Sequence, residues 1–139
     1  MITMTSEYLG ELRTRTEHLQ SGSILITDAP TDNQGKGEAF SPTDTLCTAL
    51  CTCMMTLMGI AANREGIDLK GLKAEIEKIM ASNPRKVSKV RITFTHPGLV
   101  GTAEQEKILT EAARTCPVAL SVSADLIQDV TFNFNRIQP

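Results

Sequence analysis

The chain has 139 residues and a net charge of −2, with 22% charged and 41% apolar residues. This length suits one domain with a real core, and these proportions are those of a globular protein rather than a disordered one. Basic residues are scattered and Trp is absent, so neither charge nor stacking surfaces indicate a nucleic-acid or membrane partner.

The N-terminus has no basic segment followed by an apolar one, so no secretory signal is predicted. The chain has four Cys, and without such a signal they indicate the reducing cytoplasm, where thiols are structural, metal-bound or catalytic. We therefore expect a cytoplasmic protein.

Residues 1–28 are predicted to form two strands. Residues 12–19 are polar and weakly alternating, a turn follows at 21–22, and 24–27 is a short β-branched run. Residues 29–40 are rich in Pro, Gly, Asp and Asn, which predicts an irregular loop. A loop of this length in a small domain is usually functional or mobile.

The central helix is predicted over residues 41–66. Ser41 is a good N-cap, Pro42 suits the first helical position and Gly66 is the expected stop. Residues 46–62 carry no charge and reach the lower limit for a membrane span. Thr and Gly dilute this run, and a helix that is apolar on all sides is more often the central helix of a domain.

The remainder, residues 70–139, is predicted as β-β-α-β. Residues 72–80 fit both a half-buried strand and one face of a helix, whereas 90–94 alternate cleanly as a strand. Thr-x-x-Gln at 102–105 is a capping box that opens a second helix. Apolar residues alternate again from 126 to 134, which predicts a final strand.

The predicted order is β-β-α-β-β-α-β in a single domain over residues 1–139, an α+β fold with antiparallel sheets. Strands this short cannot enclose a central helix that is apolar on every side. A second subunit would supply the missing cover, so we expect an intimate homodimer.

Two cysteines have distinctive settings: Cys53 lies within the buried helix, and Cys116 is followed at once by Pro117. A residue before proline leaves helical dihedral angles, so Cys116 is predicted to cap the next turn near free N–H groups, which favours a thiolate. The alternative is that Cys116 is a small core residue. Their separation in sequence gives no contact by itself.

The other two cysteines, Cys47 and Cys51, share one face of the central helix, and Cys53 lies about 200° round from Cys51. They are predicted to be small buried residues. The spacing C-x3-C-x-C is not that of a zinc site, so we expect no metal and no cofactor. His18 and His96 are solitary, and a Cys–His hydrolytic pair is left open.

Several stretches resemble the OsmC/Ohr superfamily, the osmotically inducible and organic-hydroperoxide-resistance proteins. SPTDTLCTALCTCMMTLMGIAANREGIDL resembles that family's helix, which has a Pro start and a buried Cys. RTCPVALSVS resembles its second signature, a Cys-Pro-Val after a helix, and the loop DAPTDNQGKGEAF resembles that of the OsmC-like subgroup with a Ser-Pro-Thr-Asp start. The resemblance covers nearly the whole chain, in the expected order.

The resemblance implies an intertwined homodimer, with the central helix wrapped by sheets of both subunits and active sites at the interface. It favours a strand over residues 72–80. It matches Cys53 to the peroxidatic cysteine and Cys116 to the resolving one. The implied function is a peroxiredoxin-like oxidoreductase of oxidative-stress defence, in which Cys53 reduces an organic hydroperoxide, the sulfenic acid condenses with Cys116, and an external dithiol reduces the disulfide.

The chain departs from the family pattern at the groups that activate the thiolate. Better-characterised members pair a Glu, just after the helix-starting Pro, with an Arg from the preceding loop, whereas Thr43 and Asn33 stand at these positions. Asp44 could replace the Glu as a catalytic residue. The cation could come from Lys36, Arg13, Arg15 or Arg85.

Two other interpretations stay open. The first keeps the OsmC fold without peroxidase activity, as a protein that binds an apolar small molecule at the dimer interface. The second makes the thiols part of the core only.

Overall fold

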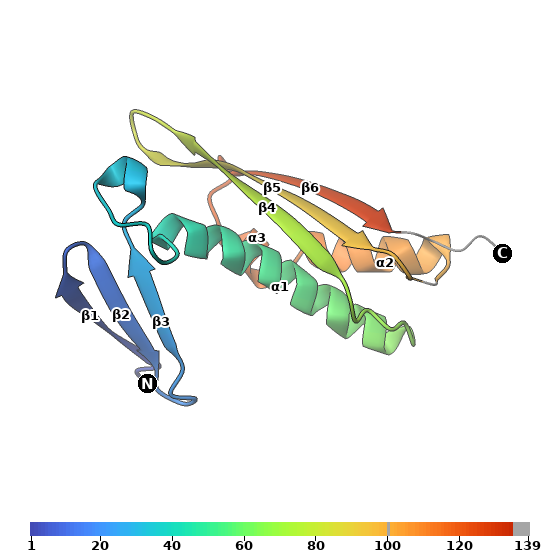
Figure 1. Ribbon diagram of the computed structural model, residues 1–139. Coiled ribbons are helices and arrows are strands. Elements are labelled where there is room, and N and C mark those ends of the chain that lie inside the picture. Colours follow the sequence, from blue (N-terminus) through green and yellow to red (C-terminus); the bar gives the residue numbers. More distant parts are fainter. Residues whose placement is uncertain (100, 135–139) are drawn as a thin grey trace. The chain divides into compact units, whose positions relative to one another are not determined.

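The computed structural model describes residues 1–99 and 101–134 (Figure 1). The chain forms two compact units, Met1–Leu46 and Cys47–Pro139, and each is described by itself. The prediction of a single domain is not tested by this grouping and stays a prediction.

The first unit contains an antiparallel sheet of three strands in the order β1-β2-β3. Its strands are β1 (Met4–Gly10), β2 (Arg13–His18) and β3 (Ile24–Asp28). The sequence predicted β2 and β3 but missed β1. Six of the seven β1 residues are exposed, so the strand has no buried face whose apolar residues would mark every second position.

Residues 29–40 form a loop, as predicted, with one short 3₁₀ turn, η1 (Thr31–Asn33). The loop folds back closely on its own beginning at Gly35. A Cβ at this position would lie 1.7 Å from the Ala29 carbonyl oxygen, so only glycine fits.

The long helix α1 (Pro42–Arg64) agrees with the predicted central helix. Ser41 and Asp44 cap it reciprocally, because Ser41 Oγ accepts from the Asp44 N–H and Asp44 Oδ2 accepts from the Ser41 N–H, each at 3.0 Å. By length and composition alone α1 could cross a membrane, a test that core helices also pass, and 39% of its most apolar window is buried.

The second unit contains a sheet in the order β4-β5-β6, made of β4 (Lys73–Ala81), β5 (Lys86–His96) and β6 (Ile127–Phe134). Residues 72–80 are therefore mainly strand, as the resemblance favoured. β4 and β5 are antiparallel, but β6 runs parallel to β5, unlike the predicted antiparallel sheets. Two helices, α2 (Ala103–Arg114) and α3 (Pro117–Ser121), return the chain so that β6 starts at the same end as β5.

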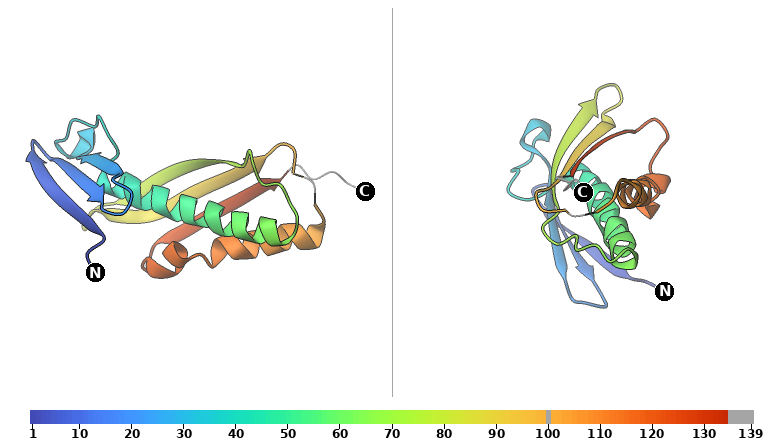
Figure 2. Two further views of the ribbon diagram at one scale, coloured as in Figure 1. Left: turned by 90° about the horizontal axis from the view of Figure 1, so that it is seen from below. Right: turned by 90° about the vertical axis from the view of Figure 1, so that its right-hand side faces the viewer.

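Figure 2 shows α1 and α2 side by side across one face of this sheet. The core between these two helices and the sheet consists of one side of α1, the inward residues of β5 and the buried face of α2. The largest fully buried side chain is Phe94 of β5, whose ring stacks on Phe132 of β6 at a centroid distance of 5.4 Å. The thiols of interest lie on the helices that pack against this sheet.

Candidate functional site

Helix α1 presents the Cys53 side chain toward α3. The sulfur accepts a hydrogen bond from the backbone N–H of Val118, with 3.5 Å between Sγ and N. Cys53 is half-buried and packs against the core cluster, so its thiol is less enclosed than the sequence suggested. Residues 65 positions apart thus meet at this sulfur.

Cys116 is the N-cap of α3, and Pro117 follows in the first turn. Its φ of −68° and ψ of 153° are extended rather than helical, as expected before a proline. The Cys116 sulfur accepts from the Ala119 N–H at 3.4 Å, so the predicted capping role is confirmed. Cys116 is also fully buried in the core cluster, so the core interpretation holds alongside the capping one.

The two predicted thiols interact with each other. Burial raises the pKa of Cys116, the Ala119 N–H lowers it, and a hydrogen bond to Cys53 with that group's charge raises it further. The net effect is a raised pKa, so the prediction that this environment favours a Cys116 thiolate is wrong. Burial destabilises the Cys116 thiolate more than the backbone N–H donors stabilise it.

The remaining thiols lie on the core side of α1, as predicted. Cys47 and Cys51 are buried, and Cys51 Sγ contacts Met55 Sδ at 3.9 Å. Burial raises the pKa of Cys51 to about 11, so this thiol stays protonated at neutral pH. All four cysteines are free.

Neither histidine forms the Cys–His pair that the sequence left open. Nε2 of His96 lies 2.9 Å from the Lys70 carbonyl oxygen, and Nδ1 accepts from the Gly98 N–H at 3.2 Å. Both ring nitrogens thus contact the backbone, one before the start of β4 and the other just after the end of β5. His18 Nδ1 instead contacts the Ser21 hydroxyl at 2.7 Å, a contact within the β2–β3 turn.

Asp44, the predicted substitute for the family's Glu, makes the contacts of a helix cap. Thr43, at the position of the family's Glu, contacts the Ser41 hydroxyl at 3.1 Å. Asp44 holds the first turn of α1 through Ser41. Its catalytic role stays a prediction.

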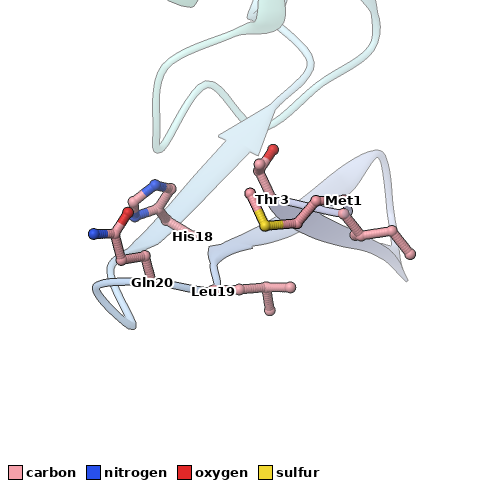
Figure 3. A pocket seen from close by; sticks show the side chains of 6 residues that line it. Met1, Thr3, His18, Leu19 and Gln20 are labelled. Carbon is pink, nitrogen blue, oxygen red and sulfur yellow. The ribbon is translucent and has the colours of Figure 1, made fainter.

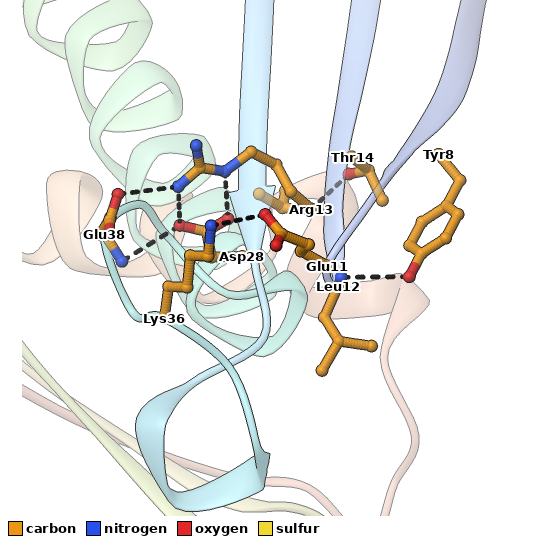
Figure 4. Close-up of polar contacts among 9 residues, drawn as sticks. Tyr8, Glu11, Leu12, Arg13, Thr14, Asp28, Lys36 and Glu38 are labelled. Carbon is orange, nitrogen blue, oxygen red and sulfur yellow. Dashed lines mark hydrogen bonds and ion pairs between the residues drawn. The ribbon is translucent and has the colours of Figure 1, made fainter.

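The candidate cations of the first unit have carboxylate partners of their own (Figure 4). Arg13 binds Asp28 through two nitrogens, at 2.6 and 2.9 Å, and binds Glu38 at 3.0 Å. The Arg13 guanidinium holds the pKa of Asp28 below its usual range, and Asp28 is nearly fully buried. Lys36 bonds Glu11 at 2.7 Å, and Arg15 lies 3.8 Å from Glu17.

Sequence reasoning missed this Arg13–Asp28 pair. Arg13 and Asp28 are register partners across β2 and β3. The sequence predicted these two strands but not their register, and the register is what pairs the two residues. Arg85, the fourth candidate cation, lies in the turn between β4 and β5.

The first unit also has a surface hollow (Figure 3). It is lined by Met1, Ile2, Thr3, His18, Leu19 and Gln20. Among residues 1–99 and 101–134, no group of three or more His, Cys, Asp or Glu could hold a metal ion.

Comparison with known proteins gives one family and many related structures. Residues 35–128 match a family model described as OsmC-like protein. A candidate osmotic stress induced and detoxification response protein from Psychrobacter arcticus 273-4 is 49% identical, with a TM-score of 0.91 and 96% of each chain covered. No curated protein sequence matches the chain.

More distant structures share the fold alone. An organic hydroperoxide resistance protein OsmC from Legionella pneumophila is 18% identical, with a TM-score of 0.68, and 96% of this chain and 98% of that chain are covered. An OsmC-like protein of unknown function from Vibrio cholerae is 16% identical, with a TM-score of 0.74 and coverage of 91% and 96%. The α+β fold predicted from the order of elements in the sequence is therefore confirmed.

Proposed function

This chain belongs to the OsmC-like protein family, and on that premise we propose that it is a thiol-dependent peroxidase that reduces organic hydroperoxides in cytoplasmic stress defence. The observation that carries the proposal is that the Cys53 and Cys116 sulfurs accept hydrogen bonds from neighbouring N–H groups of one turn, those of Val118 and Ala119. Two thiols on different helices have no structural need to meet, whereas a disulfide-forming pair must.

The proposed reaction begins at Cys53. Its thiolate attacks one oxygen of the hydroperoxide, the O–O bond breaks, and the alkoxide leaves and takes up a proton to become the alcohol. Cys53 is now a sulfenic acid, oxidised by two electrons. Cys116 attacks this sulfur, a disulfide forms and water leaves. An external dithiol then returns both sulfurs to thiols and becomes a disulfide itself.

The contrast among the thiols of α1 supports Cys53 as the nucleophile. The pKa of Cys51 is raised to about 11 by burial, so little thiolate forms there at neutral pH. Cys53 is more open and accepts the Val118 N–H. A donor to sulfur stabilises the charged form that attacks peroxide.

We propose that the protein acts as a homodimer. The buried residues of α1 share one side of the helix, whereas Leu46 and Ile60 are 38% and 43% exposed. Residues 1–46, all of which the structure describes, bury only Thr27, Asp28 and Ser41. A three-stranded sheet without buried apolar side chains needs cover from elsewhere, and a second copy would supply it.

The uncovered side of α1 also supports a second candidate function. A protein of this family without the Glu–Arg couple could hold an apolar small molecule at the dimer interface, with inert thiols. Thr43 and Asn33, which stand where the couple would be, favour this alternative.

Stopped-flow measurement of peroxide reduction, with cumene hydroperoxide and a dithiol, tests the proposal. Cys53→Ser should abolish turnover. Cys116→Ser should permit one oxidation of Cys53 and then stall, because no thiol resolves the sulfenic acid.

Cys51→Ala is the matched control, because it removes a thiol from the core side of the same helix. It should retain turnover. Undiminished rates in both the Cys53 and Cys116 variants would refute the peroxidase and leave the apolar-ligand function, which binding of an apolar fluorescent probe to the wild-type protein would then test.

A further inference from the structure

The strand β6 carries a polar residue on its apolar side. Its inward positions alternate, and beside Gln128 they are Val130, Phe132 and Phe134, all half-buried. Gln128 pairs in register with Val90 of β5, which is 1% exposed and lies in the core. A glutamine at such a position destabilises the fold unless its amide finds a hydrogen-bond partner.

The partner of Gln128 is a backbone carbonyl of α3. Nε2 of Gln128 donates to the Ala119 oxygen at 2.9 Å. The N–H of the same Ala119 donates to Cys116 Sγ, and the preceding N–H, that of Val118, donates to Cys53 Sγ. One turn of backbone thus joins Gln128 to both sulfurs.

This turn has little stability of its own. Helix α3 has five residues, and the backbone bonds at its ends join the Leu120 N–H to the Cys116 oxygen and the Val122 N–H to the Val118 oxygen. A helix this short does not form in isolation, so contacts with the rest of the fold determine its position. The bond from Gln128 is such a contact, and it comes from the sheet.

We infer that Gln128 is a positioning residue for the thiol pair, and that it acts by holding α3 where the Val118 N–H reaches the Cys53 sulfur. This inference rests on the proposed function for its role in catalysis. The hydrogen bond from the Val118 N–H stabilises the Cys53 thiolate and does not involve the peroxide. A hydrogen bond to a charged acceptor is stronger than one to a neutral acceptor, so moving the donor away destabilises the Cys53 thiolate.

The test is Gln128→Met, which keeps the length of the side chain and removes the donor. Alkylation of Cys53 by iodoacetamide is followed against pH, and fragmentation mass spectrometry locates the label. We expect the midpoint of the profile to rise and the rate at pH 7 to fall by about threefold to tenfold. Gln128→Leu, a second apolar replacement, should give the same direction.

The matched control is Gln105→Met. Gln105 Nε2 also donates to a backbone carbonyl, that of Glu65, at 3.3 Å, and Gln105 belongs to the cap of α2. This variant should lose stability in urea and keep the Cys53 profile within about twofold of the wild type. The amide proton shift of Val118 gives a second readout, and its pH-dependent change should shrink in Gln128→Met only.

A wild-type profile in both Gln128 variants would overturn the inference, as would an equal shift in Gln105→Met. Peroxide consumption is measured separately on the same samples. A wild-type protein that consumes no peroxide refutes the proposed function, whereas the comparison of alkylation profiles still decides the role of Gln128.

Discussion

Removal of the Phe94 ring is the sharpest test of the second unit's packing. Phe94 lies on the central strand β5, is 0% exposed, and stacks on Phe132 with an interplanar angle of 19°. Truncation of a fully buried Phe to Ala costs about 3–5 kcal/mol, because apolar contact is lost and a cavity remains. The stacked pair adds about 0.5–1.5 kcal/mol beyond area burial.

We therefore expect Phe94→Ala to lower the free energy of unfolding by about 3–5 kcal/mol, as measured by urea unfolding at fixed protein concentration. Phe132→Ala should cost less, because Phe132 is half-buried. A double-mutant cycle with both changes isolates the energy of the pair.

The ring of Phe132 also lies under the Arg114 guanidinium, at 5.3 Å from the centroid. Because Arg114 comes two residues before Cys116, loss of this stack should loosen the end of α2 that precedes the thiol.

A cost below about 1 kcal/mol for Phe94→Ala would refute the packing described above.

Three further predictions concern charge, thiol reactivity and assembly. Because pairing with Arg13 lowers the pKa of Asp28, its contribution to stability is present above the unfolded pKa of about 3.9 and disappears as pH falls through the folded value. Asp28→Asn should therefore be less stable than wild type at pH 7, and the difference in urea midpoint should narrow as pH falls below the unfolded pKa. A difference independent of pH would contradict the ion pair. Burial raises the pKa of Cys51 from 9.0 to about 11, so this residue should hold about a hundredfold less thiolate at pH 8 than an unperturbed thiol. Mass spectrometry can follow its labelling by iodoacetamide, and a labelling rate equal to that of free cysteine would disprove this. Ile60→Lys places a charge on the exposed apolar side of α1 and should weaken the proposed dimer in sedimentation equilibrium, whereas an unchanged molecular mass would exclude this side as the interface.

The strongest local signals in the sequence correctly predicted where two helices begin. The Ser41–Pro42 start produced α1, and the capping box at Thr102 and Gln105 produced α2. Both depend on side chains that bond to the backbone within four residues, so the chain needs no distant partner to specify them.

Signals that depend on distant partners were misread or missed. β1 lacks a buried face, so nothing in its sequence alternates as a strand should. The thiolate prediction for Cys116 relied on free N–H groups near Pro117, which do contact the sulfur, but it could not include the burial that outweighs them.

The amino-acid order by itself specified where helices begin, which residues are apolar, and that Cys53 and Cys116 are the thiols to consider. Only the tertiary structure decided that these sulfurs lie beside the same turn of α3, that β6 runs parallel to β5, and that Gln128 reaches this turn. The physical reason is range. Caps and periodicity act within a few residues, whereas sulfur contacts, strand direction and desolvation are set by segments that lie far apart along the chain and come together only when it folds.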